Sequence, residues 1–140
     1  MTLLRVSHGT NDLLHTTDGR TYIDLISSTG AVFLGHANAA VNRHIIEQLG
    51  RLSCSWTSET DIQDQCKDVV GDHLPDRLRL LSLYSSGTEA TEVAIRLACH
   101  ETGRTAIIGF ARNNHGKTVA AQNVSAVDAD LPHIDGFYRI

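Results

Sequence analysis

Apolar and polar positions in the first part of the chain predict a hairpin followed by a helix. Two segments that suit strands, 13–15 and 21–25, flank the turn residues Asp18-Gly19, and glycine tolerates the positive φ that tight hairpin turns require. After Asn38, which can cap a helix, apolar residues recur on one helical face as far as Leu49. That face needs a covering surface, because packing of the apolar side supplies most of a helix's stability in proteins.

From residue 60 onward, amphipathic helical stretches alternate with short apolar runs that suit strands. In chain order the predicted elements are a helix from Thr60 ended by Pro75, a strand over 78–84, a helix through 90–98 ended by Gly103, a strand over 105–110 and a short helix over 118–122. Residues 126–140 show no clear period, so we expect a connecting segment there.

The order strand, turn, helix, strand, turn, helix is typical of a parallel sheet with right-handed crossovers. We therefore expect an α/β fold, with an N-terminal segment of hairpin and helix over 1–58 and the first part of a larger domain over 59–140. Two parallel strands leave open sheet edges and uncovered helix faces, so we do not expect this piece to be stable alone.

Composition excludes several classes of function. Hydrophobic residues make up 41% of the chain, enough for a core, and the net charge of -4 comes from charges scattered without basic runs, so nucleic acid is not an expected partner. Apolar runs are far shorter than the roughly 20 residues that span a bilayer, and we expect a cytoplasmic protein without a signal segment. Three separated cysteines and eight histidines without HxxxH spacing predict neither disulfides nor a metal site.

An anion-binding turn is predicted over 85–88, where a strand runs into a helix. The free amides of the first helical turn and the positive end of the helix dipole attract an anion there. Gly87 lets an oxygen approach the backbone, while Ser86 and Thr88 add hydroxyl donors. The alternative is that Ser86 or Thr88 only caps the helix, with Glu89 or Glu92 completing the cap.

Residues 111–118 can be written AxxxxGKT, which is a permissive match to a P-loop. In a P-loop, backbone amides would wrap nucleotide phosphates, Lys117 would reach the terminal ones and Thr118 would bind magnesium. Ala111 replaces the usual glycine, and no later apolar strand ends in an aspartate that would hold the metal. A nucleotide-binding module stays an alternative at this point.

Five motifs stand in an order that resembles the class III aminotransferases of fold type I, and together they cover nearly the whole chain. They are Asp18-Gly19-x-x-Tyr22-Ile23-Asp24, Gly35-His36, Ser86-Gly87-Thr88-Glu89-Ala90-x-Glu92, Thr102-Gly103-Arg104 and His115-Gly116-Lys117-Thr118. The resemblance implies the N-terminal portion of a fold type I transferase that uses pyridoxal 5'-phosphate, with a small β element and the start of a largely parallel large-domain sheet.

The resemblance also implies site residues. The family's Ser-Gly-Thr turn cups the cofactor phosphate, and this role transfers to 86–88. Asn114 stands where the family usually has an aromatic residue stacked on the pyridine ring, so Asn114 and His115 are expected to border the ring; a loop that hydrogen-bonds itself is the other interpretation. Ser27 and Ser28 are expected near the substrate, with the pocket role assigned to Ser28, and Trp56 is expected either near the substrate or as a core or interface anchor.

The chain holds two lysines, and neither stands where the family keeps its Schiff-base lysine. Lys67 falls on a predicted exposed helix face and Lys117 belongs to the His-Gly-Lys-Thr motif. The family supplies the lysine and the acidic partner of the pyridinium nitrogen from segments beyond the point that matches Ile140. No catalytic residue is therefore expected in this chain.

We expect a second polypeptide to carry the remainder of the fold and the catalytic lysine, which makes this chain the small subunit of a split enzyme. Because the family forms dimers with active sites at the interface, the assembly would be a heterodimer or heterotetramer. The expected reaction is amino transfer between an amine or amino acid and a keto acid. Racemase or epimerase, aminomutase and decarboxylase chemistry of the same fold stay open, as do a non-catalytic regulatory subunit and a truncated product.

Overall fold

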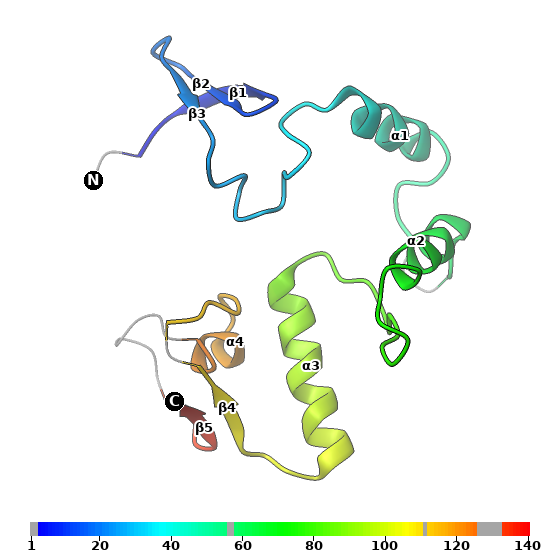
Figure 1. Ribbon diagram of the computed structural model, residues 1–140, viewed down its shortest axis with the longest axis vertical. Helices are drawn as coiled ribbons and strands as arrows, with labels where there is room; N and C mark the ends of the chain where they lie inside the picture. The colour runs from blue at the N-terminus through cyan, green and yellow to red at the C-terminus, as the bar shows by residue number, and fades with distance from the viewer. Residues whose placement is uncertain (1–2, 56–57, 111, 126–132) are drawn as a thin grey trace. The chain divides into compact units, whose positions relative to one another are not determined.

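The computed structural model describes residues 3–55, 58–110, 112–125 and 133–140 (Figure 1). Contacts between residues divide it into two compact units, Met1–Glu59 and Thr60–Ile140. Each unit holds its own sheet, one antiparallel and one parallel. The two units are therefore described one after the other.

The first unit begins with a three-stranded antiparallel sheet of order β1-β2-β3. The predicted hairpin is confirmed as β2 (Leu13–Thr16) and β3 (Thr21–Ile23), with Gly19 at φ 82° in the turn between them. A further strand, β1 (Val6–Thr10), pairs with β2 and was not predicted. Most of its residues are exposed, and its sequence, Val-Ser-His-Gly-Thr, lacks the alternation of apolar and polar residues that predicts a strand.

A long loop connects β3 to α1 (Ala39–Leu49), the helix predicted after Asn38. The Asn38 side chain accepts hydrogen bonds from the amides of Ala40 at 3.1 Å and Val41 at 3.2 Å, which confirms the cap. No residue of α1 is buried, and Ile46 on its apolar face is 67% exposed. The predicted covering surface for this helix is therefore absent from the described residues.

In the second unit, local capping signals place three helices close to their predicted positions. Thr60 and Gln63 form a reciprocal capping box at the start of α2 (Asp61–Gly71). Helix α3 (Gly87–Thr102) ends at Gly103, which adopts a left-handed φ of 65°. The short helix predicted over 118–122 is α4 (Val119–Asn123).

Strand β4 (Ile107–Gly109) pairs in parallel with β5 (Phe137–Arg139), and the intervening chain carries α4. This is the predicted α/β arrangement, reduced to two strands. The connecting segment predicted over 126–140 was wrong at its end, because 137–139 form β5. A three-residue strand is too short to show a period in sequence; its pairing with β4 decides its conformation. Residues 126–132 lie outside the described residues.

The strand predicted over 78–84 was also wrong, since no strand forms there in the structure. The segment is apolar, yet Leu81 is 71% and Leu78 is 53% exposed. A strand is held by hydrogen bonds to a neighbouring strand, and no described strand lies beside this segment. Its sequence favours a sheet, but the pairing partner is missing.

The core of the described residues is small and lies at α4. Ala121 at 0% and Val124 at 6% exposure are the buried hydrophobic residues in the described part of the chain, beside the fully buried Ser125. Backbone packs directly on backbone here, because a Cβ added to Gly109 of β4 would lie 2.1 Å from the carbonyl oxygen of Val124. Most other large apolar side chains face solvent.

Candidate functional site

The start of α3 combines a closed cap with an open approach to the backbone. Ser86 Oγ accepts from the Glu89 amide at 3.2 Å and donates to the Glu89 carboxylate at 3.1 Å. This is the capping arrangement expected as one alternative, with Glu89 rather than Glu92 completing it. Apart from the neighbouring residues and the backbone of α3 itself, no described atom lies within 4 Å of the position a Cβ on Gly87 would take. An anion can therefore approach the first helical turn at Gly87.

Backbone amides and the helix dipole remain to attract such an anion. Within the described chain, the amides of Gly87 and Thr88 donate to no protein oxygen, as is usual for the first turn of a helix. The sixteen-residue α3 adds the positive end of its dipole. The hydroxyl proton of Ser86 is held by Glu89 and must turn away from that carboxylate before it can serve an anion.

Thr88 lies directly against the second motif. A Cβ added to Gly116 would be 2.5 Å from Thr88 Oγ1 and 2.8 Å from its Cγ2, and Gly116 has a φ of 143°. Only glycine allows the loop to approach the helix so closely. The structure therefore brings together the first turn of α3 and the His115-Gly116 loop, which the sequence separates by a helix and a strand.

The loop that carries Asn114 and His115 is held by one hydrogen bond of its own and by one to Ser125, which lies beyond α4. Asn114 Oδ1 accepts from the Gly116 amide at 3.1 Å, and the His115 amide donates to Ser125 Oγ at 2.8 Å. Ser125 Oγ in turn donates to the carbonyl of Ala121 at 2.6 Å. Asn114 is exposed and His115 half-buried. Asn114 thus bonds within the loop, as the alternative expected, whereas His115 bonds outside it, and contact of these side chains with a cofactor ring stays a prediction.

Glu92 has a role that sequence reasoning missed. Its Oε1 accepts from the Thr118 hydroxyl and, at 3.2 Å, from the Ala121 amide. Thr118 stands at the N-cap of α4 but makes no capping bond to its own helix, so the Glu92 carboxylate on α3 supplies that cap from outside. The signal in the sequence was a threonine before a helix, but it could not name a partner on another element.

These bonds argue against the P-loop alternative. The amides of His115 and Gly116, which a P-loop would aim at phosphates, donate instead to Ser125 Oγ and Asn114 Oδ1. The Thr118 hydroxyl donates to Glu92, Lys117 is exposed, and α4 is a five-residue helix. Ala111 lies outside the described residues.

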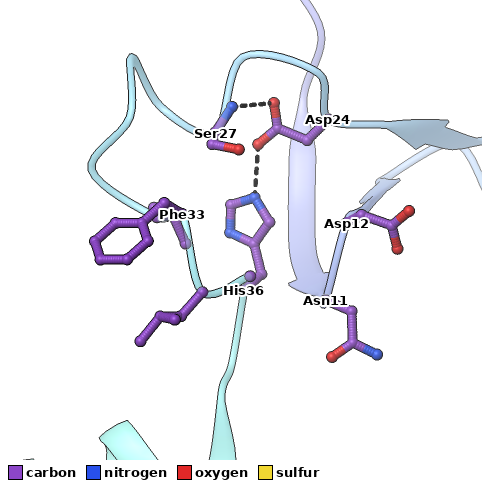
Figure 2. A pocket seen from close by; sticks show the side chains of 9 residues that line it. Asn11, Asp12, Asp24, Ser27, Phe33 and His36 are labelled. Carbon is purple, nitrogen blue, oxygen red and sulfur yellow. Dashed lines mark hydrogen bonds and ion pairs between the residues drawn. The ribbon is translucent and has the colours of Figure 1, made fainter.

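The first unit holds a separate pocket of about 340 Å³ (Figure 2). It is lined by Asn11, Asp12, Asp24, Ser27, Val32, Phe33, Leu34, Gly35 and His36. His36 Nε2 lies 2.8 Å from Asp24 Oδ2, while Asp24 Oδ1 accepts from the amides of Ile26 at 3.0 Å and Ser27 at 2.9 Å. The hydrogen bond to His36, and then the two amides, lower the pKa of Asp24 below its ordinary value.

The loop at this pocket contains a run of left-handed residues. Ser27, Ser28 and Thr29 have φ values of 49°, 50° and 60°, a region that non-glycine residues seldom occupy. The bonds from the Ile26 and Ser27 amides to Asp24 hold the start of this turn. Ser28 is exposed, and Ser27 lines the pocket in its place. The substrate role of Ser28 stays a prediction, and Trp56 lies outside the described residues.

Metal-binding clusters and membrane-spanning helices are absent from the described part of the chain. No cluster of three or more histidine, cysteine or acidic side chains there could hold a metal ion. Likewise, none of the described helices is long and apolar enough to cross a membrane. Polar groups converge at the start of α3 with its loop and at the pocket beside Asp24.

Known proteins resemble this chain both in sequence and in fold. The class III aminotransferase family model matches residues 1–134. The chain is 33% identical over 123 residues to a LysW-aminoadipate semialdehyde/glutamate semialdehyde transaminase of Sulfolobus acidocaldarius, covering 87% of this chain and 32% of the relative. It is 36% identical over 116 residues to glutamate-1-semialdehyde 2,1-aminomutase 2 of Exiguobacterium sibiricum, covering 83% of this chain and 26% of the relative.

Among solved structures, a transaminase from the marine bacterium Virgibacillus superposes with a TM-score of 0.90 at 20% identity, over 99% of this chain and 34% of that one. At this identity the likeness shows the fold alone, which is the N-terminal portion of a fold type I transaminase. The chain spans about a third of the length of the relatives it matches. With the family model matching nearly all of its residues, the chain belongs to the class III aminotransferases.

Proposed function

We propose that this chain provides the phosphate-binding part of an amino-group-transferring enzyme. Class III aminotransferases depend on pyridoxal phosphate. The observation that carries the proposal is the start of α3, where the open backbone at Gly87 lies next to Thr88, and Thr88 packs on the His115-Gly116 loop. Both motifs that the family resemblance assigns to the cofactor are thereby on one side of the helix start.

The residues present suit a phosphate group. The amides of Gly87 and Thr88 and the Thr88 hydroxyl can donate to its oxygens, and Ser86 can join once its proton leaves Glu89. When bound, pyridoxal phosphate supplies an electron sink for charge that develops on the substrate carbon. The role of this chain is to hold and orient that group through its phosphate, with Asn114 and His115 bordering the ring.

We propose that the proton-transferring amine comes from elsewhere in the assembly. Lys67 is paired with Asp64 on α2 at 3.2 Å, and Lys117 is an exposed residue of the second motif. We propose that a second polypeptide brings the lysine and the rest of the fold, in a heterodimer or heterotetramer. The unpaired apolar segment 78–84 and the exposed apolar face of α1 support a missing partner surface.

The names of the two curated relatives suggest which substrates to test first. Both names contain a semialdehyde, one acted on by a transaminase and the other by an aminomutase. We propose an amino acid or its semialdehyde as substrate, with the amino group either passed to a keto acid or moved within one molecule. Measuring keto-acid formation and isomerised product in the same reaction separates these two outcomes.

The decisive experiment is to produce this chain together with a candidate lysine-bearing polypeptide, such as the product of a neighbouring reading frame, and to purify the complex. We expect a yellow protein-bound cofactor and turnover that neither chain gives alone. A complex that never takes up pyridoxal phosphate would refute the cofactor role. If the 140-residue chain alone catalysed amino transfer, the split-enzyme part would be wrong.

A further inference from the structure

Helix α3 carries two contacts to the loop and helix that follow β4. Near its start, Thr88 packs against Gly116. One turn later, Glu92 accepts hydrogen bonds from Thr118 and Ala121. Because residues four apart lie on the same face of a helix, the phosphate cup and the Glu92 carboxylate face the same partner segment.

Glu92 is joined to His115 by a continuous series of hydrogen bonds. The Ala121 amide donates to Glu92 at 3.2 Å, and the Ala121 carbonyl accepts from Ser125 Oγ at 2.6 Å. Ser125 Oγ accepts from the His115 amide at 2.8 Å. Ser125 is fully buried, so water does not compete for its two bonds. The position of the His115 backbone therefore depends on a carboxylate on another element.

We infer that Glu92 is a positioning residue, which holds the Asn114-His115 loop against the phosphate cup of α3 so that the loop can border the cofactor ring. This inference rests on the proposed function. Glu92 does not touch the cup itself; it acts through Thr118, Ala121 and Ser125. Its carboxylate also lies at the N-terminus of α4, where the helix dipole favours a negative charge.

The chemistry of the Glu92 bonds predicts a graded series of variants. Both contacts use Glu92 as an acceptor, so Glu92→Gln keeps an acceptor oxygen but loses the charge, whereas Glu92→Ala loses both. Hydrogen bonds to charged groups are the stronger ones. Glu101→Gln is the matched control, because Glu101 lies on the same helix, is 75% exposed and, within the described residues, is paired only with its neighbour His100.

The test compares two probes on this chain in complex with the polypeptide that completes the fold. Pyridoxal 5'-phosphate senses the cup and the loop, while inorganic phosphate senses the cup alone. We expect Glu92→Ala to weaken pyridoxal phosphate about tenfold, Glu92→Gln less, and neither to change phosphate affinity more than about twofold. Hydrogen exchange of the His115 and Ala121 amides should quicken in Glu92→Ala and stay unchanged in Glu101→Gln.

Several results would overturn the inference. Equal weakening of both probes would mean that Glu92 only supports α3, and an unchanged affinity for pyridoxal phosphate would mean that the loop needs no such hold. Should Glu92→Ala fail to fold, Thr118→Val removes one donor from the same carboxylate and should weaken pyridoxal phosphate selectively. Wild-type protein that binds neither probe would refute the proposed function and the inference together. If the wild type binds both probes, a failure of the Glu92 variants to behave as expected would refute the inference alone.

Discussion

Thr88 shows how one residue links two motifs of the candidate site. Its half-buried side chain packs on Gly116, while its amide belongs to the open first turn of α3. Ser86 is different, because its hydroxyl proton is already held by Glu89. Of the two hydroxyls, Thr88 is therefore the one we expect to matter more for the phosphate.

Replacing Thr88 with valine keeps the shape and removes the hydroxyl donor. We expect pyridoxal phosphate to bind more weakly by about 1.5 to 3 kcal/mol, the range for a hydrogen bond to a charged group. Titration of the complex with the cofactor measures this. Thr91→Val is the control, since the Thr91 hydroxyl donates to the Gly87 carbonyl within the helix. Equal cofactor affinities of the two variants would contradict a role of the Thr88 hydroxyl in binding the phosphate.

Asp24 predicts a pH dependence of stability. Its pKa in the folded protein is lowered from the ordinary 3.8 by the bond to His36 and by the amides of Ile26 and Ser27. Because the Asp24 carboxyl has the higher pKa in the unfolded state, the unfolded protein takes up its proton at a higher pH than the folded protein does. The stability that Asp24 contributes is therefore complete above pH 3.8 and is lost as the pH falls through the folded pKa. We expect Asp24→Asn to lower stability at neutral pH and to make stability fall less steeply on acidification.

Urea-unfolding midpoints of the complex, measured from neutral to acidic pH, test the role of Asp24. Asp12→Asn is the matched control, because Asp12 lines the same pocket and its side chain makes no hydrogen bond or ion pair among the described residues. If the wild type and Asp24→Asn lost stability in parallel on acidification, the acid sensitivity would lie in other groups.

Elements with their own capping signals follow the sequence closely, whereas elements that need a distant partner do not. Asn38 and Thr60 start helices as predicted, and Ser86 does so as one of the alternatives expected, since each side chain bonds to amides within its own helix. Strand β5 was missed and the strand over 78–84 did not form, because both depend on a neighbouring strand that periodicity does not reveal.

Close packing of β4 on the end of α4 makes Gly109 sensitive to any side chain. An alanine Cβ would meet the Val124 backbone oxygen at 2.1 Å, and neither backbone can easily yield. We expect Gly109→Ala to destabilise the protein by about 1 to 3 kcal/mol in urea unfolding. In Gly71→Ala, by contrast, the new Cβ has open space in α2, and stability should hold or rise. Equal changes in stability for Gly109→Ala and Gly71→Ala would show that the backbone at Val124 can move to accept the new methyl group.

At the scale of the whole molecule, the described residues expose more apolar surface than a self-sufficient domain would. Leu25 is 90% and Phe33 80% exposed, and the buried hydrophobic core in the described residues consists of Ala121 and Val124. Large exposed apolar patches mark interaction surfaces. The exposure agrees with a chain that spans about a third of its relatives.

Leu81 tests the proposed partner surface, because it is 71% exposed in the unpaired segment 78–84. Burial of an unpaired charge is costly, so we expect Leu81→Asp to weaken association with the completing polypeptide by at least about 2 kcal/mol. Leu81→Ile keeps the apolar volume and should assemble normally. Sedimentation of the mixed chains reports both. Undiminished assembly of Leu81→Asp would place the interface elsewhere.

The sequence by itself determined the caps, the helices, the hairpin and the family, because these rest on short-range bonds and on motifs that stand together along the chain. It also showed that neither lysine occupies the Schiff-base position of that family. Only the tertiary structure decided that Glu92 caps α4, that Gly116 packs on Thr88 and that residues 137–139 pair with β4. Those contacts join residues far apart in the chain, and their geometry depends on how the elements pack.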